Sequence, residues 1–417
     1  MFRAFQSRNY RLYFCGQSIS QIGTWMQRTG VSWVIYTMTH STFMLGLTIF
    51  ASQFPSFLFS LLGGIFADRH NRYKILLVTQ SASMIQAFTL AALLLTKHYM
   101  IWEVLGLSMI LGLINSFDVP ARQPLVHDLV RDKSELSNAL ALNSSMVNVA
   151  RLTGPALSGI ILEKYGAGIC FLLNGLSFVA VLISLLLLKL PPYRAPALTS
   201  NMRAELSEGF AYLKGTPTIS LTLLMLTAIS LLVLPYDTLL PVFAKDVFKG
   251  NAMTYGYIYS FIGFGAICGT LLLASLRPGA DLKKVLFINT IVLGLGLIFF
   301  ALSKNFLLAV VFGVAMGFGA MSQGTISIMI IQIHSHHRMR GRMISYVAMA
   351  MFGMLPLGSL LVGLVSLHLG AANAMLVMGM MAIIIALLSA RFSRKNRLES
   401  DHPVDIEEAK EIVTEKI

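Results

Sequence analysis

Long stretches without a charged residue recur along this chain, and they restrict its fold more than any other feature. A helix that crosses the hydrocarbon core of a bilayer needs about 20 mainly apolar residues. Runs of this kind lie at residues 75–96, 165–188, 215–236, 250–276 and 285–303. Together with a composition of 56% hydrophobic and 12% charged residues, they indicate an integral membrane protein.

The remaining spans carry polar residues or run into one another. They are expected at residues 11–38, 44–66, 102–119, 138–163 and 305–337, with two more inside 343–390 on either side of residues 368–372. We therefore predict an all-α membrane protein with twelve transmembrane helices. The first helix has full length and no small-residue cleavage site follows it, so we expect no cleaved signal peptide.

The arginines and lysines indicate how the spans are oriented. They alternate between crowded loops and nearly empty ones, and the sparse loops hold only Lys97, Lys164, Lys245, Lys249 and Lys304. Because cytoplasmic loops carry the excess of basic residues, we expect a multi-pass protein of the plasma (inner) membrane with both termini in the cytoplasm. The net charge of +13 then reflects membrane topology, and no nucleic-acid partner is expected.

A segment rich in proline and charge divides the chain near its middle, LPPYRAPALTSNMRAELSEGFAYLKGTP. It predicts a short amphipathic helix on the cytoplasmic surface, because apolar residues recur at helical spacing at Met202, Leu206, Phe210 and Leu213. We expect a six-helix half at 1–190, a linker at 191–217, a second six-helix half at 218–391 and an acidic cytoplasmic tail at 392–417. The halves resemble each other weakly, and transporters built from two such halves bind substrate near the membrane midplane.

Several motifs resemble a known family. The loop GGIFADRHNRYK, Gly63 to Lys74, is similar to the signature loop of the major facilitator superfamily, and RLTGPALSG, Arg151 to Gly159, is similar to the fifth-helix motif of its antiporter branch. The segments QIGTWMQR, DVPARQPLVHDLV, NALALNSSMVNVAR and MRGRMISYVAMAMFGMLPLGS resemble the subfamily that contains the enterobactin exporter and macrolide efflux pumps. The resemblance covers almost the whole chain and implies an exporter with two pseudo-symmetric six-helix halves.

The resemblance also gives the signature loop a role. It implies a contact that holds the two halves together in the outward-facing state, here called the latch. Its expected members are Gly64, Asp68, Arg69, Arg72 and Lys74, with Arg122 or the helix start near Gly341 as partner. The alternative is a basic loop that only sets topology, although topology does not require the carboxylate of Asp68.

Gly154, Pro155 and Gly159 form the core of the fifth-helix motif. Proline removes a backbone donor and glycine removes a side chain, so the motif predicts a bend and a close approach between helices. The resemblance connects it with antiport, whereas the residues alone are equally compatible with a packing kink.

Two polar stripes on predicted helices carry an arginine each. The first helix has Gln17, Gln21, Thr24, Arg28 and Ser32, and the fifth has Ser144, Asn148, Arg151, Pro155 and Ser158. An arginine that faces lipid costs roughly 2.5 to 3.5 kcal/mol on insertion scales. Both arginines should therefore face the interior of the bundle, where Gln21, Thr24, Arg28, Ser32, Asn148 and Arg151 are candidate substrate contacts.

Acidic residues within the predicted spans are few. Asp118 lies at the cytoplasmic end of the fourth helix and Asp237 inside the seventh, while Glu103 and Glu163 lie at the outer boundary. Two central arginines with at most one central acid leave positive charge that a bound anion would compensate. The alternative is that Asp118, Asp237 or helix carbonyls pair with the arginines and only hold the bundle together.

Asp237 is a further candidate substrate contact. It is also the first candidate for a proton carrier, with Asp118 as the second. Pro235 lies beside Asp237 and should break the seventh helix there. Protonation of such an acid can favour one conformation of a transporter while substrate binding favours the other.

The sequence has no nucleophile with a base, no glycine-rich phosphate loop and no paired carboxylates, so we predict neither an enzyme nor a cofactor. The cluster His334, His336 and His337 is interpreted as a solvated loop and not as a metal site. We predict a monomeric, proton-coupled exporter of a small molecule, either a siderophore-like anion or a drug. The alternatives are uptake or facilitated transport of an anionic or lipid-like metabolite and, in another class, a sensor or scaffold without transport activity.

Overall fold

The structure is a computed structural model that describes residues 3–130, 135–190, 208–210, 212–213, 215–277, 279–336 and 339–400, without the side chains of 393–400. All regular elements in these residues are helices. Five of them form the N-terminal half: α1 (Arg8–Thr39), α2 (Thr42–Arg69), α3 (Arg72–Thr96), α4 (Ile101–Leu129) and α5 (Leu136–Leu186).

Helix α5 is a hairpin of two helical limbs. The backbone leaves the helical region at Gly166, whose φ is 81° and ψ 171°, a conformation that suits glycine. The limbs lie side by side, since Ser158 Oγ is 3.6 Å from Cys170 Sγ and donates a hydrogen bond to the carbonyl of Met26. One helix of 51 residues therefore supplies two membrane spans.

The helices of the C-terminal half are interrupted in two places. The span Pro217–Val247 consists of α7 (Pro217–Leu232), a 3-10 turn (Leu234–Leu239), α8 (Leu240–Val242) and a π-turn (Phe243–Val247). A second π-turn (Met349–Gly353) separates α12 (Arg340–Ala348) from α13 (Met354–Leu369). The other helices are α9 (Ala252–Ala274), α10 (Leu282–Leu302), α11 (Phe306–His334) and α14 (Ala371–Ser400).

Ten helical segments of the described residues are long and apolar enough to cross a membrane. The hairpin α5 is one of these ten, and α1 is a further 32-residue helix that carries the polar stripe. With α1 added and both limbs of α5 counted, the described residues contain the twelve predicted spans. The prediction of an all-α membrane fold in two halves is confirmed.

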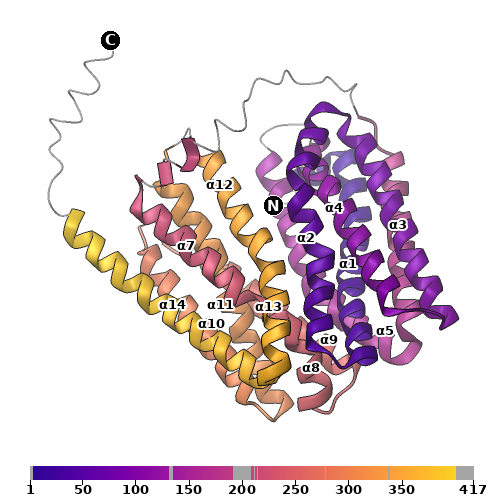
Figure 1. Cartoon of the computed structure of the whole chain (residues 1–417). Coiled ribbons are helices and arrows are strands. Elements are labelled where there is room, and N and C mark those ends of the chain that lie inside the picture. Colours follow the sequence, from indigo (N-terminus) through magenta and orange to yellow (C-terminus); the bar gives the residue numbers. More distant parts are fainter. Residues whose placement is uncertain are drawn as a thin grey trace.

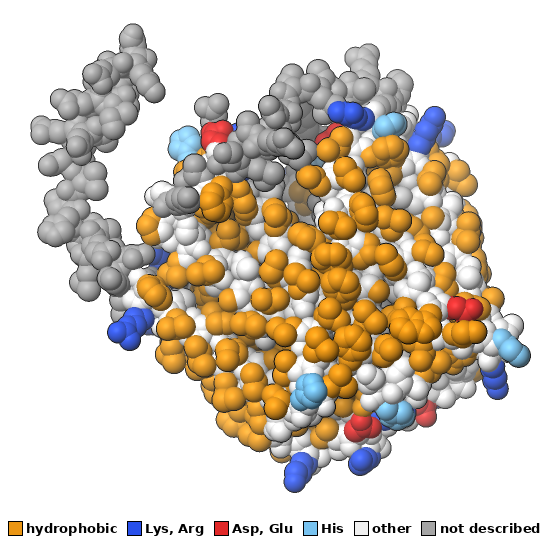
Figure 2. All heavy atoms as spheres, in the orientation of Figure 1, with side chains coloured by type: hydrophobic (Ala, Val, Ile, Leu, Met, Phe, Trp, Pro, Cys, Tyr) orange, Lys and Arg blue, Asp and Glu red, His pale blue; other side chains and the backbone are white. Residues whose placement is uncertain are grey.

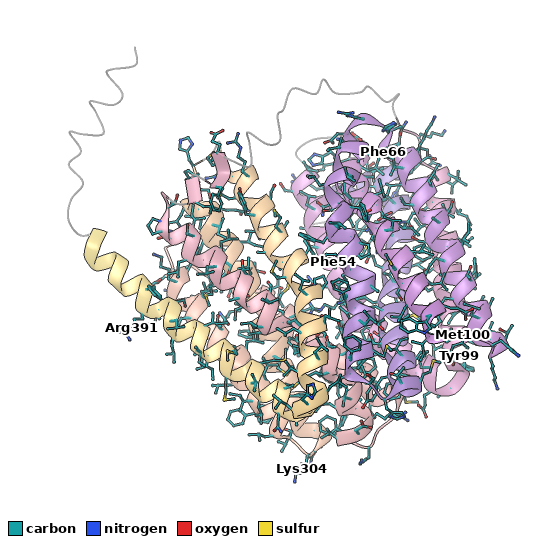
Figure 3. All side chains as sticks on the ribbon, in the orientation of Figure 1. Phe54, Phe66, Tyr99, Met100, Lys304 and Arg391 are labelled. Atoms are coloured by element: carbon teal, nitrogen blue, oxygen red, sulfur yellow. The ribbon has the colours of Figure 1, made fainter. Side chains whose placement is uncertain are left out.

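The two halves lie next to each other, close together at one end and apart at the other (Figure 1). The end where they separate also holds the N-terminus and is called the terminal end. Phe66 lies toward the terminal end and Lys304 at the opposite, far end (Figure 3). Apolar side chains cover the middle of the visible face, and lysines and arginines gather toward its two ends (Figure 2).

Some boundaries differ from those predicted. Helix α4 continues through Pro120 and Pro124 to Leu129, so Arg122 lies within a helix and not in a loop. The continuation is stabilised by an ion pair of 2.8 Å between Arg122 and Asp118, one turn apart. Helix α14 runs past residue 391 to Ser400.

The predicted linker helix falls largely outside the described residues, including Met202 and Leu206. Of its other two apolar positions, Leu213 is buried and Phe210 is exposed. Leu213 packs in a cluster with Ile331 and Met343, which attaches this segment to the C-terminal half.

Candidate functional site

Arg28 and Arg151 meet over one aromatic ring. Their guanidinium carbons lie 5.2 Å and 5.8 Å from the ring centroid of Trp25, which precedes Arg28 by one turn of α1. The attraction between each cation and the ring offsets part of the repulsion between the two like charges. In the described part of the chain, neither arginine has a carboxylate within ion-pair distance. Buried Arg151 Nε also lacks a hydrogen-bond partner there.

The C-terminal half presents one acid and several aromatic rings to these arginines. Asp237 Oδ2 accepts a hydrogen bond of 2.7 Å from Tyr259 Oη, while its buried Oδ1 has no partner among the described residues. Arg28 lies near both residues, across the boundary between the halves, and is close enough to Asp237 for an electrostatic attraction. Tyr259 also lies 6.1 Å from Trp25, measured between ring centroids. Although it lies deep in the bundle among these residues, the Arg28 side chain is exposed, so it faces space that protein does not fill.

Two further rings extend this aromatic wall. Tyr255 stacks on Trp33 with centroids 5.9 Å apart and interacts with Ser32 and Arg28. Tyr236, next to Asp237, lies near Arg151. The site therefore combines two cations from the N-terminal half with an acid and three tyrosines from the C-terminal half.

A local break in α7 positions Asp237. Pro235 has no backbone N–H, and α7 ends at Leu232, just before the 3-10 turn that contains Asp237. Val233, between these elements, leaves the helical region with φ −123° and ψ −50°. The helix break predicted at Pro235 is confirmed.

The other residues of the two stripes differ in their surroundings. Ser32 donates a 3.2 Å hydrogen bond to the carbonyl of Arg28 and lies in the site. Gln21, Thr24 and Asn148 are half-buried, and the structure gives no hydrogen bond for their side chains within the described residues. They lie on the helices that carry the arginines, and their role as substrate contacts stays a prediction.

Asp118 lies elsewhere. It is buried in the N-terminal half, pairs with Arg122 and accepts hydrogen bonds of 2.9 Å and 2.7 Å from Thr79 and Gln80. These contacts occupy both of its oxygens, so Asp118 does not neutralise Arg28 or Arg151. Of the two acids predicted as proton carriers, only Asp237 lies at the central arginines.

The predicted latch residues lie at the terminal end, where the halves are apart. Asp68 pairs with Arg72 at 3.2 Å. Arg122, its predicted partner, pairs with Asp118 instead. Gly64 and Gly341 face open space, and Arg69 and Lys74 are exposed. A latch between the halves stays a prediction about another conformation.

The fifth-helix motif brings three helices together. α5 continues through Pro155, and the only backbone departure within α5 is at Gly166. A Cβ at Gly154 would lie 2.6 Å from Trp25 Cβ of α1, and one at Gly159 would lie 2.6 Å from the carbonyl oxygen of Ala252 of α9. The motif thus permits the close approaches that hold Trp25 beside Arg151, without breaking the helix.

Contacts between the halves gather at the far end. Tyr36 Oη donates a hydrogen bond to Asp246, and Thr42 Oγ1 donates one of 3.0 Å to the carbonyl of Gly363. Glu163 accepts a 3.3 Å hydrogen bond from the backbone N–H of Ala252, the first residue of α9. Sequence reasoning did not anticipate these pairs, because each joins residues far apart in the chain.

The aromatic residues of the site were also missed. Two signals were available: Trp25 lies one turn before Arg28, and Tyr255 and Tyr259 are four residues apart on one face of α9. Histidine, cysteine and acidic residues of the described chain form no group of three that could bind a metal.

The sequence matches the family of transmembrane secretion effectors over residues 1–414. It is 26% identical over 412 residues to the staphyloferrin A transporter of Staphylococcus aureus, covering 94% of this chain and 99% of that protein. Macrolide efflux protein A of Streptococcus pyogenes is 22% identical over 404 residues (94% and 98% covered). The enterobactin exporter EntS of Shigella flexneri is 25% identical over 334 residues (80% and 79%).

Solved transporters share the fold. A POT family transporter in complex with 5-aminolevulinic acid superposes with a TM-score of 0.74 at 13% identity, over 93% of this chain and 96% of that chain. A bacterial homologue of the human lysosomal transporter Spinster, inward-facing and unoccupied, gives 0.69 at 15% identity, over 92% and 96%.

Proposed function

From the premise that this chain belongs to the transmembrane secretion effector family of major facilitator transporters, we propose that it exports a small organic molecule with acidic groups. The family and its relatives are membrane transporters and not enzymes. The observation that carries the proposal is the pair Arg28 and Arg151 at Trp25, with neither arginine in an ion pair in the described chain.

The chemistry of this pair favours an anion. A guanidinium group binds a carboxylate through two parallel hydrogen bonds, and such charge-assisted bonds are stronger than neutral ones. Asp237 can offset only one of the two positive charges. The rings of Trp25, Tyr255 and Tyr259 offer stacking surfaces for a planar group. A siderophore-like acid fits this combination better than a cationic drug does.

The conformation supports an exporter that loads from the terminal end. The hydrogen bonds between the halves lie at the far end, and the halves separate at the terminal end (Figure 1). Because the distribution of basic residues predicts cytoplasmic termini, we infer that this conformation is open to the cytoplasm. A reporter fused after Arg397 should be active only there, and activity on the outer face would contradict this orientation.

Protonation of Asp237 should change the affinity for the substrate. An acidic substrate and the Asp237 carboxylate compete for the same arginines, so protonation of Asp237 should strengthen anion binding. A cationic drug would instead bind the carboxylate and compete with the proton, which is the linkage that proton antiport requires. The predicted antiport and the predicted preference for anions therefore exclude each other at Asp237. An inside-negative potential itself drives an anion outward, by roughly 2.3 kcal/mol per charge at 100 mV.

Flux in proteoliposomes tests the proposal. The pH gradient and the membrane potential are imposed separately, and transport of a tricarboxylate or catecholate siderophore is compared with that of a cationic dye. We expect flux of the acid, driven by the potential and lost in Arg28→Gln. Faster flux of the dye, driven by the pH gradient, would indicate a drug antiporter.

Two other outcomes correspond to the remaining alternatives. Accumulation of the acid against its gradient on the cytoplasmic side, under physiological gradients, would indicate uptake. Absence of flux for every compound, from protein that still binds the acid, would indicate a sensor or scaffold.

A further inference from the structure

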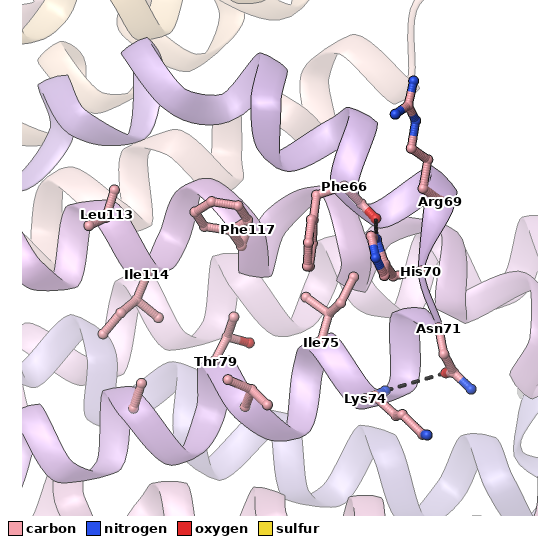
Figure 4. A pocket seen from close by; sticks show the side chains of 12 residues that line it. Phe66, Arg69, His70, Asn71, Lys74, Ile75, Thr79, Leu113, Ile114 and Phe117 are labelled. Carbon is pink, nitrogen blue, oxygen red and sulfur yellow. Dashed lines mark hydrogen bonds between the residues drawn. The ribbon is translucent and has the colours of Figure 1, made fainter. Parts of the chain in front are cut away.

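A groove opens on the outer surface of the N-terminal half, away from the central arginines. It has a volume of about 690 Å³ and lies between α2 and α3, with residues of α4 as its floor (Figure 4). It forms because α2 and α3 pack on α4 rather than on each other. α2 approaches α4 so closely that a Cβ at Gly63 would lie 1.9 Å from the carbonyl oxygen of Ser116.

The walls of the groove are apolar over most of its length. Phe66, Val78 and Leu113 are exposed, and Phe66 packs edge-on against Phe117 of the floor. On a membrane helix, exposed apolar side chains of this kind contact lipid. Hydrocarbon is therefore the natural occupant of this part of the groove.

The terminal end of the groove is cationic. Arg69, His70 and Lys74 line it there, and within the described residues neither Arg69 nor Lys74 pairs with a carboxylate (Figure 4). The nearby carboxylate of Asp68 pairs with Arg72. His70 is held against the wall, because its ring stacks on Phe66 at 4.1 Å and its Nδ1 lies 3.0 Å from the carbonyl oxygen of Phe66.

The dimensions of the groove match one leaflet. It follows α3 from Asn71 to Ala82, a rise of about 16 Å at 1.5 Å per residue. Half of a hydrocarbon core is about 15 Å thick. A single acyl chain can therefore lie along the groove while its headgroup remains at the cationic end, whereas a free anion would contact only that end.

We propose that this groove binds one anionic phospholipid of the leaflet at the terminal end, with the phosphate at Arg69 and Lys74 and an acyl chain along Val78, Leu113 and Phe117. The site is separate from the central arginines, so the proposal is independent of the transported substrate. A zwitterionic lipid fits the apolar part equally well but gains less from the two cations.

Quenching of an indole by brominated lipid tests the proposal on the full chain in nanodiscs. Val78→Trp places the reporter in the groove, and Leu61→Trp places a control on the exposed face of α2 outside it. Trp102→Phe, in both reporters, removes an exposed native indole. Phosphatidylcholine discs receive a small fraction of phosphatidylglycerol or phosphatidylcholine with brominated chains.

We expect phosphatidylglycerol to quench the groove reporter severalfold more effectively than phosphatidylcholine does, and the control reporter to show no preference. Removing one cation, by Arg69→Gln or Lys74→Gln, should lower the preference roughly fivefold. Lys304→Gln, at the far end, should leave it unchanged. Equal quenching by the two lipids, or a preference that survives the double change at Arg69 and Lys74, would overturn the proposal. Relief of quenching by millimolar inorganic phosphate would instead assign the cationic end to a free anion and also overturn it.

Discussion

The two halves of the molecule differ in how their buried polar side chains are connected and in how continuous their helices are. In the N-terminal half, Gln27 donates to Gln86 at 3.0 Å and accepts from Asn174 at 2.7 Å, and Gln86 donates to the carbonyl of Leu107. Buried side-chain atoms without a partner in the described structure occur in both halves. They belong to Ser18, Arg72, Gln80, Glu135 and Arg151 in the N-terminal half, and to Ser230, Asp237, Thr238, Ser260, Ser322, Gln323 and Ser366 in the C-terminal half. Two of its spans are also interrupted by 3-10 or π-turns.

This difference indicates which half is rigid. A connected network such as that of Gln27, Gln86 and Asn174 fixes side chains and resists rearrangement. A 3-10 or π-turn inside a span, in contrast, often marks a hinge. We infer that the N-terminal half holds the two arginines in place while the C-terminal half adapts around the substrate.

The largest expected effect comes from the fixed cations. Arg28→Gln should weaken binding of an acidic substrate about 100-fold or more, because a unit charge at ~4 Å contributes about 4 kcal/mol at an effective dielectric near 20. Arg28→Lys keeps the charge but loses the planar fork and should weaken binding less. Titration calorimetry on purified protein measures both. Equal losses for acidic and neutral ligands would mean that the arginine is part of the scaffold.

The paired network should matter for stability and not for selectivity. Asn174→Ala removes the hydrogen bonds that this side chain makes with Gln27 and Ser177 and should lower the free energy of unfolding by roughly 1–2 kcal/mol. Thermal unfolding in detergent measures the loss, and the ratio of acidic to neutral ligand affinity should stay constant. A changed ratio would contradict the separation between scaffold and site.

Asp237, the acid of the C-terminal half, should make the affinity for an acidic ligand depend on pH. As pH falls and Asp237 becomes protonated, affinity for an acidic ligand should rise by about tenfold, which corresponds to about 1.4 kcal/mol of coupling. Asp237→Asn mimics the protonated form, so its affinity should be high and constant with pH. Tyr259→Phe removes the hydrogen bond to Asp237 but keeps the carboxylate, so the dependence on pH should persist in this variant. A pH dependence that persists in Asp237→Asn would exclude this residue as the proton site.

The smallest expected effect is a difference in stability between two serine variants, one in each half. Ser158 and Ser230 are both fully buried serines, but within the described residues only Ser158 has a hydrogen-bond partner, the carbonyl of Met26. Ser158→Ala should therefore destabilise the protein by roughly 0.6–1.5 kcal/mol, whereas Ser230→Ala should change stability by less than about 0.5 kcal/mol. Equal losses in thermal unfolding would show that Ser230 has a partner in solution, such as water, and would weaken the contrast.

Local patterns in the sequence were sufficient for the spans and for the arginines. Helical spacing places Gln17, Arg28 and Ser32 on one face. The scarcity of acids left Asp237 and Asp118 as candidate partners of the arginines, and in the structure Asp237 is the one near Arg28. The predicted end of the fourth helix was wrong. We expected the helix to end before Pro120, but α4 continues through this proline, and the Asp118–Arg122 ion pair stabilises the continuous helix.

Contacts between segments far apart in the sequence could not be predicted from such local patterns. Tyr36 and Asp246 are separated by 210 residues, and no periodicity relates them. The aromatic wall depends on the same long-range packing, since Trp25 and Tyr259 belong to different halves. The same sequence adopts every conformation of a transporter, so it does not tell which end of the bundle is closed in a given conformation.

The backbone N–H of Ala252 donates its hydrogen bond to Glu163 of the other half, so this bond should break when the halves separate at the far end. This N–H belongs to the first turn of α9, where no backbone carbonyl within the helix can accept it. Whenever the far end opens, the proton loses its acceptor and meets water. The rate of deuterium exchange at Ala252 therefore reports how readily the far end opens. A bound ligand that closes this end should slow exchange at this position, and one that opens it should speed exchange, before any larger change is visible.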